Sequence, residues 1–177
     1  MILSLNLLES VRARANFACE YCGITETDAG GELSVDHFQP QCEKGSDELA
    51  NLVYSCFRCN LHKGNYWPTR PTEVMLWNPR QGPADQHLLP LADGTLHAIT
   101  PTGEQTLRRL KLNRPALIAM RIRRLQQREE TRLLGEIRDL LLSLKQMQAH
   151  YEALIARYDN LLDSQQVILD LLIRKRS

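Results

Sequence analysis

At 177 residues, the chain is long enough for one hydrophobic core, or for one compact domain with an appendage. Hydrophobic residues make up 43% and charged residues 24%, which argues against wholesale disorder. The formal net charge of +1 points to no class of partner by itself. The apolar N-terminus has no positive flank or small-residue cleavage site, and no run of about 18 apolar residues follows it. We therefore expect a cytoplasmic protein with no membrane partner.

The chain divides into three zones by composition. Residues 1–66 hold all five cysteines and the pattern of several short elements. Residues 67–115 are rich in proline and glycine, so we expect an irregular extension packed on the core, with a short hairpin at Asp93-Gly94. Residues 116–177 contain no proline and only Gly135, which predicts a long helix.

Four of the five cysteines form two Cys-x-x-Cys pairs. Cys19 and Cys22 are the first pair, and Cys56 and Cys59 are the second. The two-residue spacer turns both sulfurs of a pair inward, and two pairs complete a tetrahedron without an open position. The pattern predicts a structural zinc ion, with a redox pair as the alternative. The fifth cysteine, Cys42, has no predicted role.

Between the two pairs, the pattern predicts a strand, a polar loop and a second strand. Residues 33–38 alternate between apolar and polar before Pro40, residues 43–48 are polar, and residues 51–55 favour a strand again. Residues 59–64 are typical of the start of a helix that Gly64 closes.

These residues resemble the HNH endonuclease family. The shared pattern is Cys-x-x-Cys, then Asp-His-x-x-Pro from Asp36, then Asn51-Leu52, then Cys-x-x-Cys-Asn-x-x-Lys ending at Lys63. Each part alone is common, but all of these parts together in this order are specific. Further similarity, to a compact bacterial subgroup, covers roughly residues 3–125 and leaves out the helical tail. The resemblance implies an α+β fold, with a small zinc-stabilised ββα-metal domain followed by a long helical or coiled-coil region.

The resemblance also assigns roles to four residues. His37 matches the general base, and Asp36 matches the carboxylate that binds a divalent cation, Mg²⁺ or Mn²⁺. Asn60 matches the second ligand of that cation, at a position that is often histidine. Asn51 matches the residue that fixes the loop and orients the histidine. Imidazole suits a base because its pKa lies near working pH. A hydrogen-bonded strand histidine and a simple loop cap are the alternatives for His37 and Asn51.

Positive charge is concentrated in one segment. Residues 105–128 carry eight basic residues and no acidic one, which is typical either of a polyanion-binding surface or of a solvated helix face. Lys63 is either a phosphate contact or a solvated lysine. The candidate nucleic-acid contacts are Arg58, His62, Lys63, Arg80, Arg108 and Arg109.

The C-terminal region carries a heptad repeat. Twelve positions from Leu133 to Leu172 follow alternating steps of four and three residues, with one polar interruption at Gln165. The next positions along are also apolar, so the stripe is wider than a simple dimeric zipper needs. We expect a homo-oligomer or a protein partner through this helix. The helix is either continuous or broken into a hairpin near residues 159–164, where Ser164 would be the N-cap.

The leading hypothesis is a metal-dependent endonuclease that hydrolyses phosphodiester bonds in nucleic acid, with DNA as the expected substrate. The alternatives are a non-cleaving zinc-stabilised binding module and a nuclease subunit of a larger, helix-mediated assembly. The residues do not distinguish DNA from RNA, or single strands from double strands.

Overall fold

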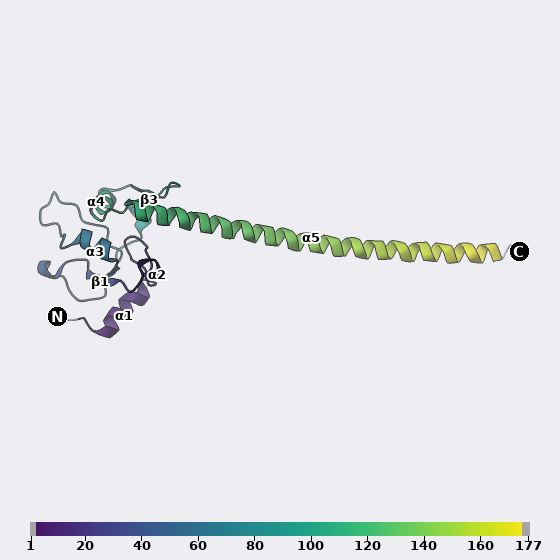
Figure 1. Ribbon diagram of the computed structural model, residues 1–177, viewed down its shortest axis with the longest axis horizontal. Coiled ribbons are helices and arrows are strands. Elements are labelled where there is room, and N and C mark those ends of the chain that lie inside the picture. Colours follow the sequence, from purple (N-terminus) through teal and green to yellow (C-terminus); the bar gives the residue numbers. More distant parts are fainter. Residues whose placement is uncertain (1–2, 175–177) are drawn as a thin grey trace. The chain divides into compact units, whose positions relative to one another are not determined.

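The computed structural model describes residues 3–174, apart from the side chains of Leu172 and Arg174. The chain forms two units, residues 1–124 and residues 125–177, and each is described by itself. The first unit holds short strands and helices, and the second is part of one long helix (Figure 1). The expected α+β class is confirmed. No helix among the described residues has the length and apolar character needed to cross a membrane.

The centre of the first unit is a hairpin with a helix packed on it. Strands β1 (Ser34–His37) and β2 (Leu52–Ser55) pair antiparallel, with His37 opposite Leu52. Helix α3 (Phe57–Lys63) follows β2 directly and contacts β1. It begins before the predicted residue 59, because the Cys56 sulfur caps its N-terminus by accepting the backbone N–H of Cys59. Gly64 ends it with φ of +52°, as the sequence predicts.

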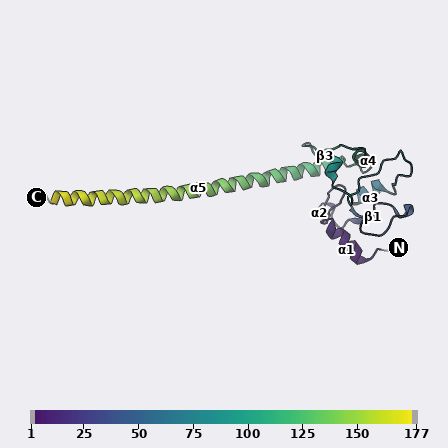
Figure 2. The same ribbon diagram turned by 180° about the vertical axis from the view of Figure 1, so that it is seen from behind.

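Two N-terminal helices cover this hairpin. Helix α1 (Leu5–Arg14) begins at its N-cap Ser4, and α2 (Glu26–Ala29) begins at a capping box formed by Thr25 and Asp28. The fully buried Val11 of α1 packs with Leu52 and Tyr54 of β2 in a small core of its own. Figure 2 shows α1 beside β1 from behind, in agreement with the contacts of α1 with both strands.

The proline-rich segment is part of the main core. Strands β3 (Leu88–Pro90) and β4 (Leu96–Ala98) form the expected hairpin, with Gly94 at φ of +79° in its turn. Helix α4 (Pro101–Arg109) follows, capped by Thr100. Two single 3₁₀ turns, η1 (Gln41–Glu43) and η2 (Ala84–Gln86), complete the unit. Buried side chains from the segment pack against the four paired cysteines; among them are Leu76, Trp77, Leu88, Leu110 and Leu112.

Helix α5 (Pro115–Arg174) is continuous over 60 residues. Its first turns place Leu117 and Met120 in the core of the first unit. The hairpin alternative does not form among the described residues: Ser164 lies within the helix and its hydroxyl donates to the Asn160 carbonyl, 2.8 Å away. The last heptad position, Leu172, has a side chain outside the described residues.

Candidate active site and metal centre

The two cysteine pairs meet in a buried cluster. The sulfurs of Cys19, Cys22, Cys56 and Cys59 all lie within 4.8 Å of one another. The Cys22 and Cys56 sulfurs are 3.7 Å apart, which is far too long for a disulfide. It is close to the roughly 3.8 Å that separates two sulfurs on a tetrahedral zinc with bonds of about 2.3 Å. Because all four ligands are sulfur and all four residues are buried, the donor set fits a structural zinc ion.

The first cysteine pair is held by a tight turn. The N–H of Gly23 donates to the Cys19 carbonyl, and the N–H of Cys19 donates to the Ile24 carbonyl, both at 2.8 Å. Gly23 has φ of +74°, a conformation that L side chains rarely adopt. The N–H of Glu20 donates to the Tyr54 carbonyl, so the turn is attached to the end of β2 just before Cys56.

Arg114 lies against the sulfur cluster, a contact that the sequence did not predict. Its guanidinium group is 3.9–4.0 Å from the sulfurs of Cys22, Cys56 and Cys59. Burial alone would lower the pKa of Arg114, but attraction to the Cys59 sulfur raises it above its ordinary value. A fixed positive charge next to these three sulfurs favours their thiolate form, which is the form that binds zinc.

Asp36 and His37 are neighbours on β1. Asp36 forms an ion pair with Lys63, with its Oδ2 atom 3.0 Å from Nζ. This buried oxygen has no hydrogen-bond partner of good geometry among the described residues. A carboxylate is a preferred ligand of hard divalent cations, so the residue type of Asp36 fits the expected cation, and Lys63 neutralises its charge in this structure.

Lys63 was expected to be either a phosphate contact or a solvated lysine, and the structure buries it. Its side chain is 1% exposed, and its Nζ atom donates to the backbone carbonyl of His37 at 2.6 Å. Lys63 therefore ties the end of α3 to β1 at the two candidate residues. Asn60 precedes Lys63 by three residues, about one turn, so the two residues lie on the same side of α3.

His37 has an acidic partner that sequence reasoning missed. Its Nε2 atom is 2.7 Å from Oδ1 of Asp47, which also accepts a hydrogen bond from Nε2 of Gln41 at 3.0 Å. The hydrogen bond with His37, and then that from Gln41, lower the pKa of the Asp47 carboxyl group below its ordinary value. Nothing in the sequence distinguished Asp47 from other acidic loop residues, because its role depends on how the loop folds back.

Asn51 holds that loop in shape. Its side-chain oxygen accepts the N–H of Gln39 at 2.8 Å, and its amide group donates to the carbonyls of Gln39 and Ser46. A Cβ atom on Gly45 would lie 1.8 Å from the Gln39 carbonyl oxygen, so only glycine fits there. The residues between β1 and β2 are thus fixed from both ends, and Asp47 lies among them.

The candidate nucleic-acid contacts differ in their surroundings. Arg58 and Arg108 are exposed, whereas Arg80 forms an ion pair with Glu20. Arg109 lies over the Tyr66 ring, 4.6 Å from its centroid, and donates to the Lys63 carbonyl.

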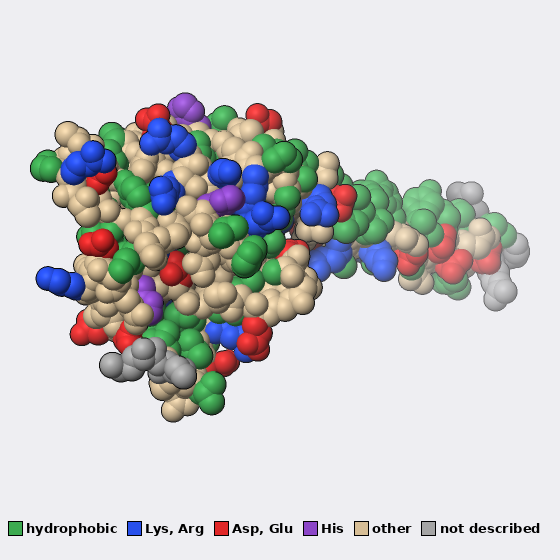
Figure 3. Space-filling view, turned by 60° about the vertical axis from the view of Figure 1, so that its left-hand side comes forward, with side chains coloured by type: hydrophobic (Ala, Val, Ile, Leu, Met, Phe, Trp, Pro, Cys, Tyr) green, Lys and Arg blue, Asp and Glu red, His purple; other side chains and the backbone are tan. Residues whose placement is uncertain are grey.

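Burial, and then the charges of Lys111, Arg114 and Arg58, lower the pKa of the His62 imidazole. Cations therefore gather around α3, and Figure 3 shows basic and histidine side chains on one face of the molecule.

The basic segment from residue 105 to residue 128 is partly structural. Arg114 contacts the sulfurs, and Arg121 donates to the carbonyls of Gly94 and Leu112. Arg124 donates to the Gly23 carbonyl and pairs with Asp28. Arginine side chains in this segment thus cap backbone carbonyls of the first unit, so its charge is not all available to a polyanion.

Comparisons with known proteins agree with the sulfur cluster and the ββα element order. The family model described as HNH endonuclease matches residues 19–66. The chain is 33% identical over 91 residues to a protein named CRISPR-associated endonuclease Cas9 from Corynebacterium diphtheriae. The aligned region is 51% of this chain but 8% of that protein, so the chain spans a small part of this relative. No solved structure matches the chain.

Proposed function

We propose that this chain, which contains an HNH endonuclease domain at residues 19–66, is a metal-dependent endonuclease that hydrolyses phosphodiester bonds in DNA. The observation that carries the proposal is the pair of adjacent side chains on β1. His37 is hydrogen-bonded to a carboxylate, and Asp36 presents a carboxylate whose Oδ2 atom is paired with the buried Lys63 ammonium. One group is suited to take a proton from water, and the other to hold a cation.

His37 would act as the general base through its Nδ1 atom. The Asp47 carboxylate would accept a hydrogen bond from Nε2–H, which fixes this tautomer and leaves Nδ1 unprotonated. When Nδ1 takes a proton from water, the Asp47 carboxylate stabilises the imidazolium that forms. The resulting hydroxide attacks phosphorus, the bond to the 3′ oxygen breaks, and a 5′-phosphate remains. His37 is 17% exposed, so water can reach it.

The expected Mg²⁺ or Mn²⁺ ion would be held by Asp36 and Asn60. When bound, it would supply positive charge for the phosphate oxygens and the departing oxygen. Asp36 would give a buried carboxylate oxygen, and Asn60 a side-chain oxygen from the facing side of α3. Two protein ligands leave room for water and phosphate oxygens, as magnesium prefers.

Zinc on Cys19, Cys22, Cys56 and Cys59 would have a structural role. Cys56 and Cys59 belong to the first turn of α3, so a bound ion fixes the helix that carries Asn60 and Lys63. All five cysteines are free, which supports a reducing, cytoplasmic setting.

Exposed cations beside α3 favour a polyanionic substrate. Arg58 on α3 and Lys111 after α4 are exposed. Burial, and then the charges of Lys111, Arg114 and Arg58, lower the pKa of His62, so these cations lie near it. A non-cleaving binding module would use the same surface, but it would not need the hydrogen-bonded His37. A helix-mediated assembly is compatible with cleavage and would involve α5 instead.

A plasmid-nicking assay tests the proposal. We expect the wild-type protein to nick supercoiled DNA with Mg²⁺ or Mn²⁺, and His37→Ala to lose at least about 100-fold in rate. His97→Ala is the matched control, because His97 also lies on a strand but is exposed and remote in sequence from the loop.

Zinc content and circular dichroism should be the same in both variants and the wild type. A His37→Ala protein that cuts as fast as wild type would contradict the mechanism. A wild-type protein that binds DNA without cutting it with either cation would favour the binding module.

A further inference from the structure

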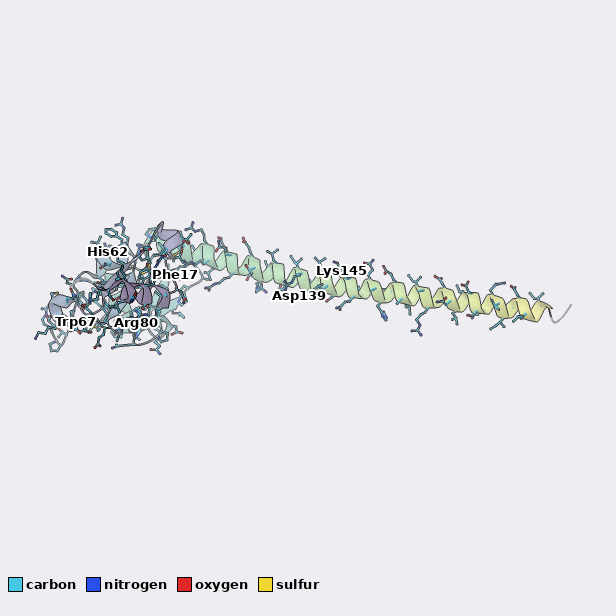
Figure 4. All side chains as sticks on the ribbon, turned by 90° about the horizontal axis from the view of Figure 1, so that it is seen from below. Phe17, His62, Trp67, Arg80, Asp139 and Lys145 are labelled. Carbon is cyan, nitrogen blue, oxygen red and sulfur yellow. The ribbon has the colours of Figure 1, made fainter. Side chains whose placement is uncertain are left out.

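The second unit exposes a large amount of apolar surface. Residues 125–174 form a single helix, and its large apolar side chains between Leu133 and Leu171 are 44–67% exposed. Figure 4 shows side chains around Asp139 and Lys145 projecting from this one helix. A long isolated helix draws most of its stability from packing of its apolar face, so this surface requires a partner.

The apolar side chains follow the heptad along the helix. The heptad stripe consists of Leu133, Ile137, Leu140, Leu144, Met147, Tyr151, Leu154, Tyr158, Leu161, Gln165 and Ile168. No residue of the stripe is charged, and the charged residues of this region all lie at other heptad positions. Figure 3 shows the same division, with hydrophobic side chains along one side of the helix and charged ones on the other.

The charge pattern does not oppose a second copy of the chain as the occupant. In a parallel, in-register pair, the positions that flank the stripe bring residues such as Glu136 opposite Leu141 and Arg157 opposite Leu162. Like charges therefore do not face one another across such an interface. The surface is electrostatically compatible with itself along its whole length.

The length of the stripe is sufficient for a stable interface. From Leu133 to Ile168 it extends about 50 Å at 1.5 Å per residue. A strip roughly 10–12 Å wide then covers about 500–600 Å² on each helix, or about 1,000–1,200 Å² for a pair. Apolar residues next to the stripe, such as Leu134, Leu141 and Ile155, allow each helix to contact more than one copy.

Gln165 selects the parallel arrangement. In parallel register its amide group meets the same amide of the other copy, and the two can form hydrogen bonds with each other. In an antiparallel pair centred on the stripe it would face apolar side chains near Ile137 and lose those partners. A single polar residue at such a position is known to fix the register of coiled coils.

We propose that copies of this chain associate through the heptad stripe of α5 as a parallel, in-register coiled coil. The interaction is independent of the proposed cleavage, because residues 125–174 contain none of the candidate active-site residues.

Light scattering on the full chain tests the association. We expect a mass of at least twice the 20.3 kDa of one chain, and a loss of assembly in the double variant Leu154→Asp, Leu161→Asp. The matched control, Ala149→Asp with Ala156→Asp, adds the same charges away from the stripe and should keep the wild-type mass. A monomeric wild type, or equal masses for the two double variants, would overturn the proposal.

Disulfide cross-linking tests the register. Cys42 is exposed and is first replaced by serine, and Gln165→Cys is then introduced. We expect an inter-chain disulfide in the parallel arrangement, and none for Gln166→Cys, which lies off the stripe. An antiparallel arrangement centred on the stripe would separate the two cysteines at residue 165 by roughly 40–45 Å, so an oligomer without this cross-link refutes the parallel register.

Discussion

At the scale of single residues, the contact between His37 and Asp47 carries most of the proposed chemistry. The 2.7 Å distance joins a strand to a loop ten residues later, and Gln41 holds the same carboxylate oxygen. Asp47 would act as a positioning residue, because it touches the base and is not proposed to touch the substrate.

Replacement of Asp47 by asparagine should lower the rate of cleavage more than substrate affinity. An amide can still reach His37, but it has no charge to stabilise the imidazolium that forms. We expect kcat to fall about 10–100-fold. KM for DNA should change little, as measured by initial nicking rates over a range of DNA concentrations. Glu48→Gln, at the exposed neighbouring residue, is the control. A change confined to KM would place Asp47 on the DNA-binding surface instead.

A second residue-scale contact makes stability depend on pH. The hydrogen bond from Arg12, and then that from Tyr54, lower the pKa of Glu26 from 4.5 to about 2. Because the folded-state pKa is depressed, the contact stabilises the fold fully above pH 4.5. Its contribution is lost as the pH falls from 4.5 towards 2.

The Glu26→Gln variant isolates this contact. We expect its free energy of unfolding to be below that of the wild type at neutral pH, and the difference to shrink as the pH falls below 4.5. Urea unfolding at a series of pH values measures the difference, and loss of zinc in acid affects both proteins alike. A difference that grows in acid would show that the ion pair does not act as described.

At the scale of elements, the loop between β1 and β2 determines whether His37 meets Asp47. Asn51 bonds to both ends of the loop, and Gly45 packs against the Gln39 carbonyl. The loop is thus a fixed part of the site, although its residues are mostly polar and partly exposed.

Gly45→Ala should disturb this loop without removing any functional group. The added Cβ would lie 1.8 Å from the Gln39 oxygen, so the backbone must move, at a cost of about 1–3 kcal/mol. We expect cleavage to fall sharply while zinc content is kept. Gly31→Ala is the matched control, because no atom lies within 4 Å of its added Cβ. Thermal unfolding and nicking rates that match in the two variants would show the loop to be adaptable.

The sequence predicted the elements that follow local rules. Alternation predicted β1, an apolar run after the polar loop predicted β2, and Asp93-Gly94 predicted the turn of the β3–β4 hairpin. The absence of proline predicted α5. The cysteine spacing predicted the sulfur cluster, because the turn geometry is local.

Contacts between residues distant in sequence could not be predicted in this way. Lys63 was ambiguous because its burial depends on how α3 packs on β1, and Arg114 was counted only as part of a basic segment. Asp47 had no local signal at all. The short helices α1 and α2 were also missed, although their caps at Ser4 and Thr25 are visible in the sequence.

At the scale of the whole molecule, the two units divide the proposed tasks. All candidate catalytic and zinc-binding residues lie in residues 1–124, and the heptad stripe lies in residues 125–177. A chain ending at Arg128 keeps the apolar contacts of Leu117 and Met120, so we expect it to fold, bind zinc and nick DNA. Its mass should be that of a monomer. Loss of zinc from this shorter chain would show that the first unit depends on the rest of α5.

The buried Lys63 also has a consequence for how the protein responds to its two metals. Its ammonium group serves as a counter-ion for Asp36, so the carboxylate is not left with an uncompensated charge. Magnesium would therefore enter a site that is electrically balanced, and it should raise the melting temperature only slightly. At the zinc site, Arg114 supplies one positive charge for four buried sulfurs, which still repel one another once ionised. Folding would then require zinc, whereas magnesium would be able to exchange with each catalytic cycle.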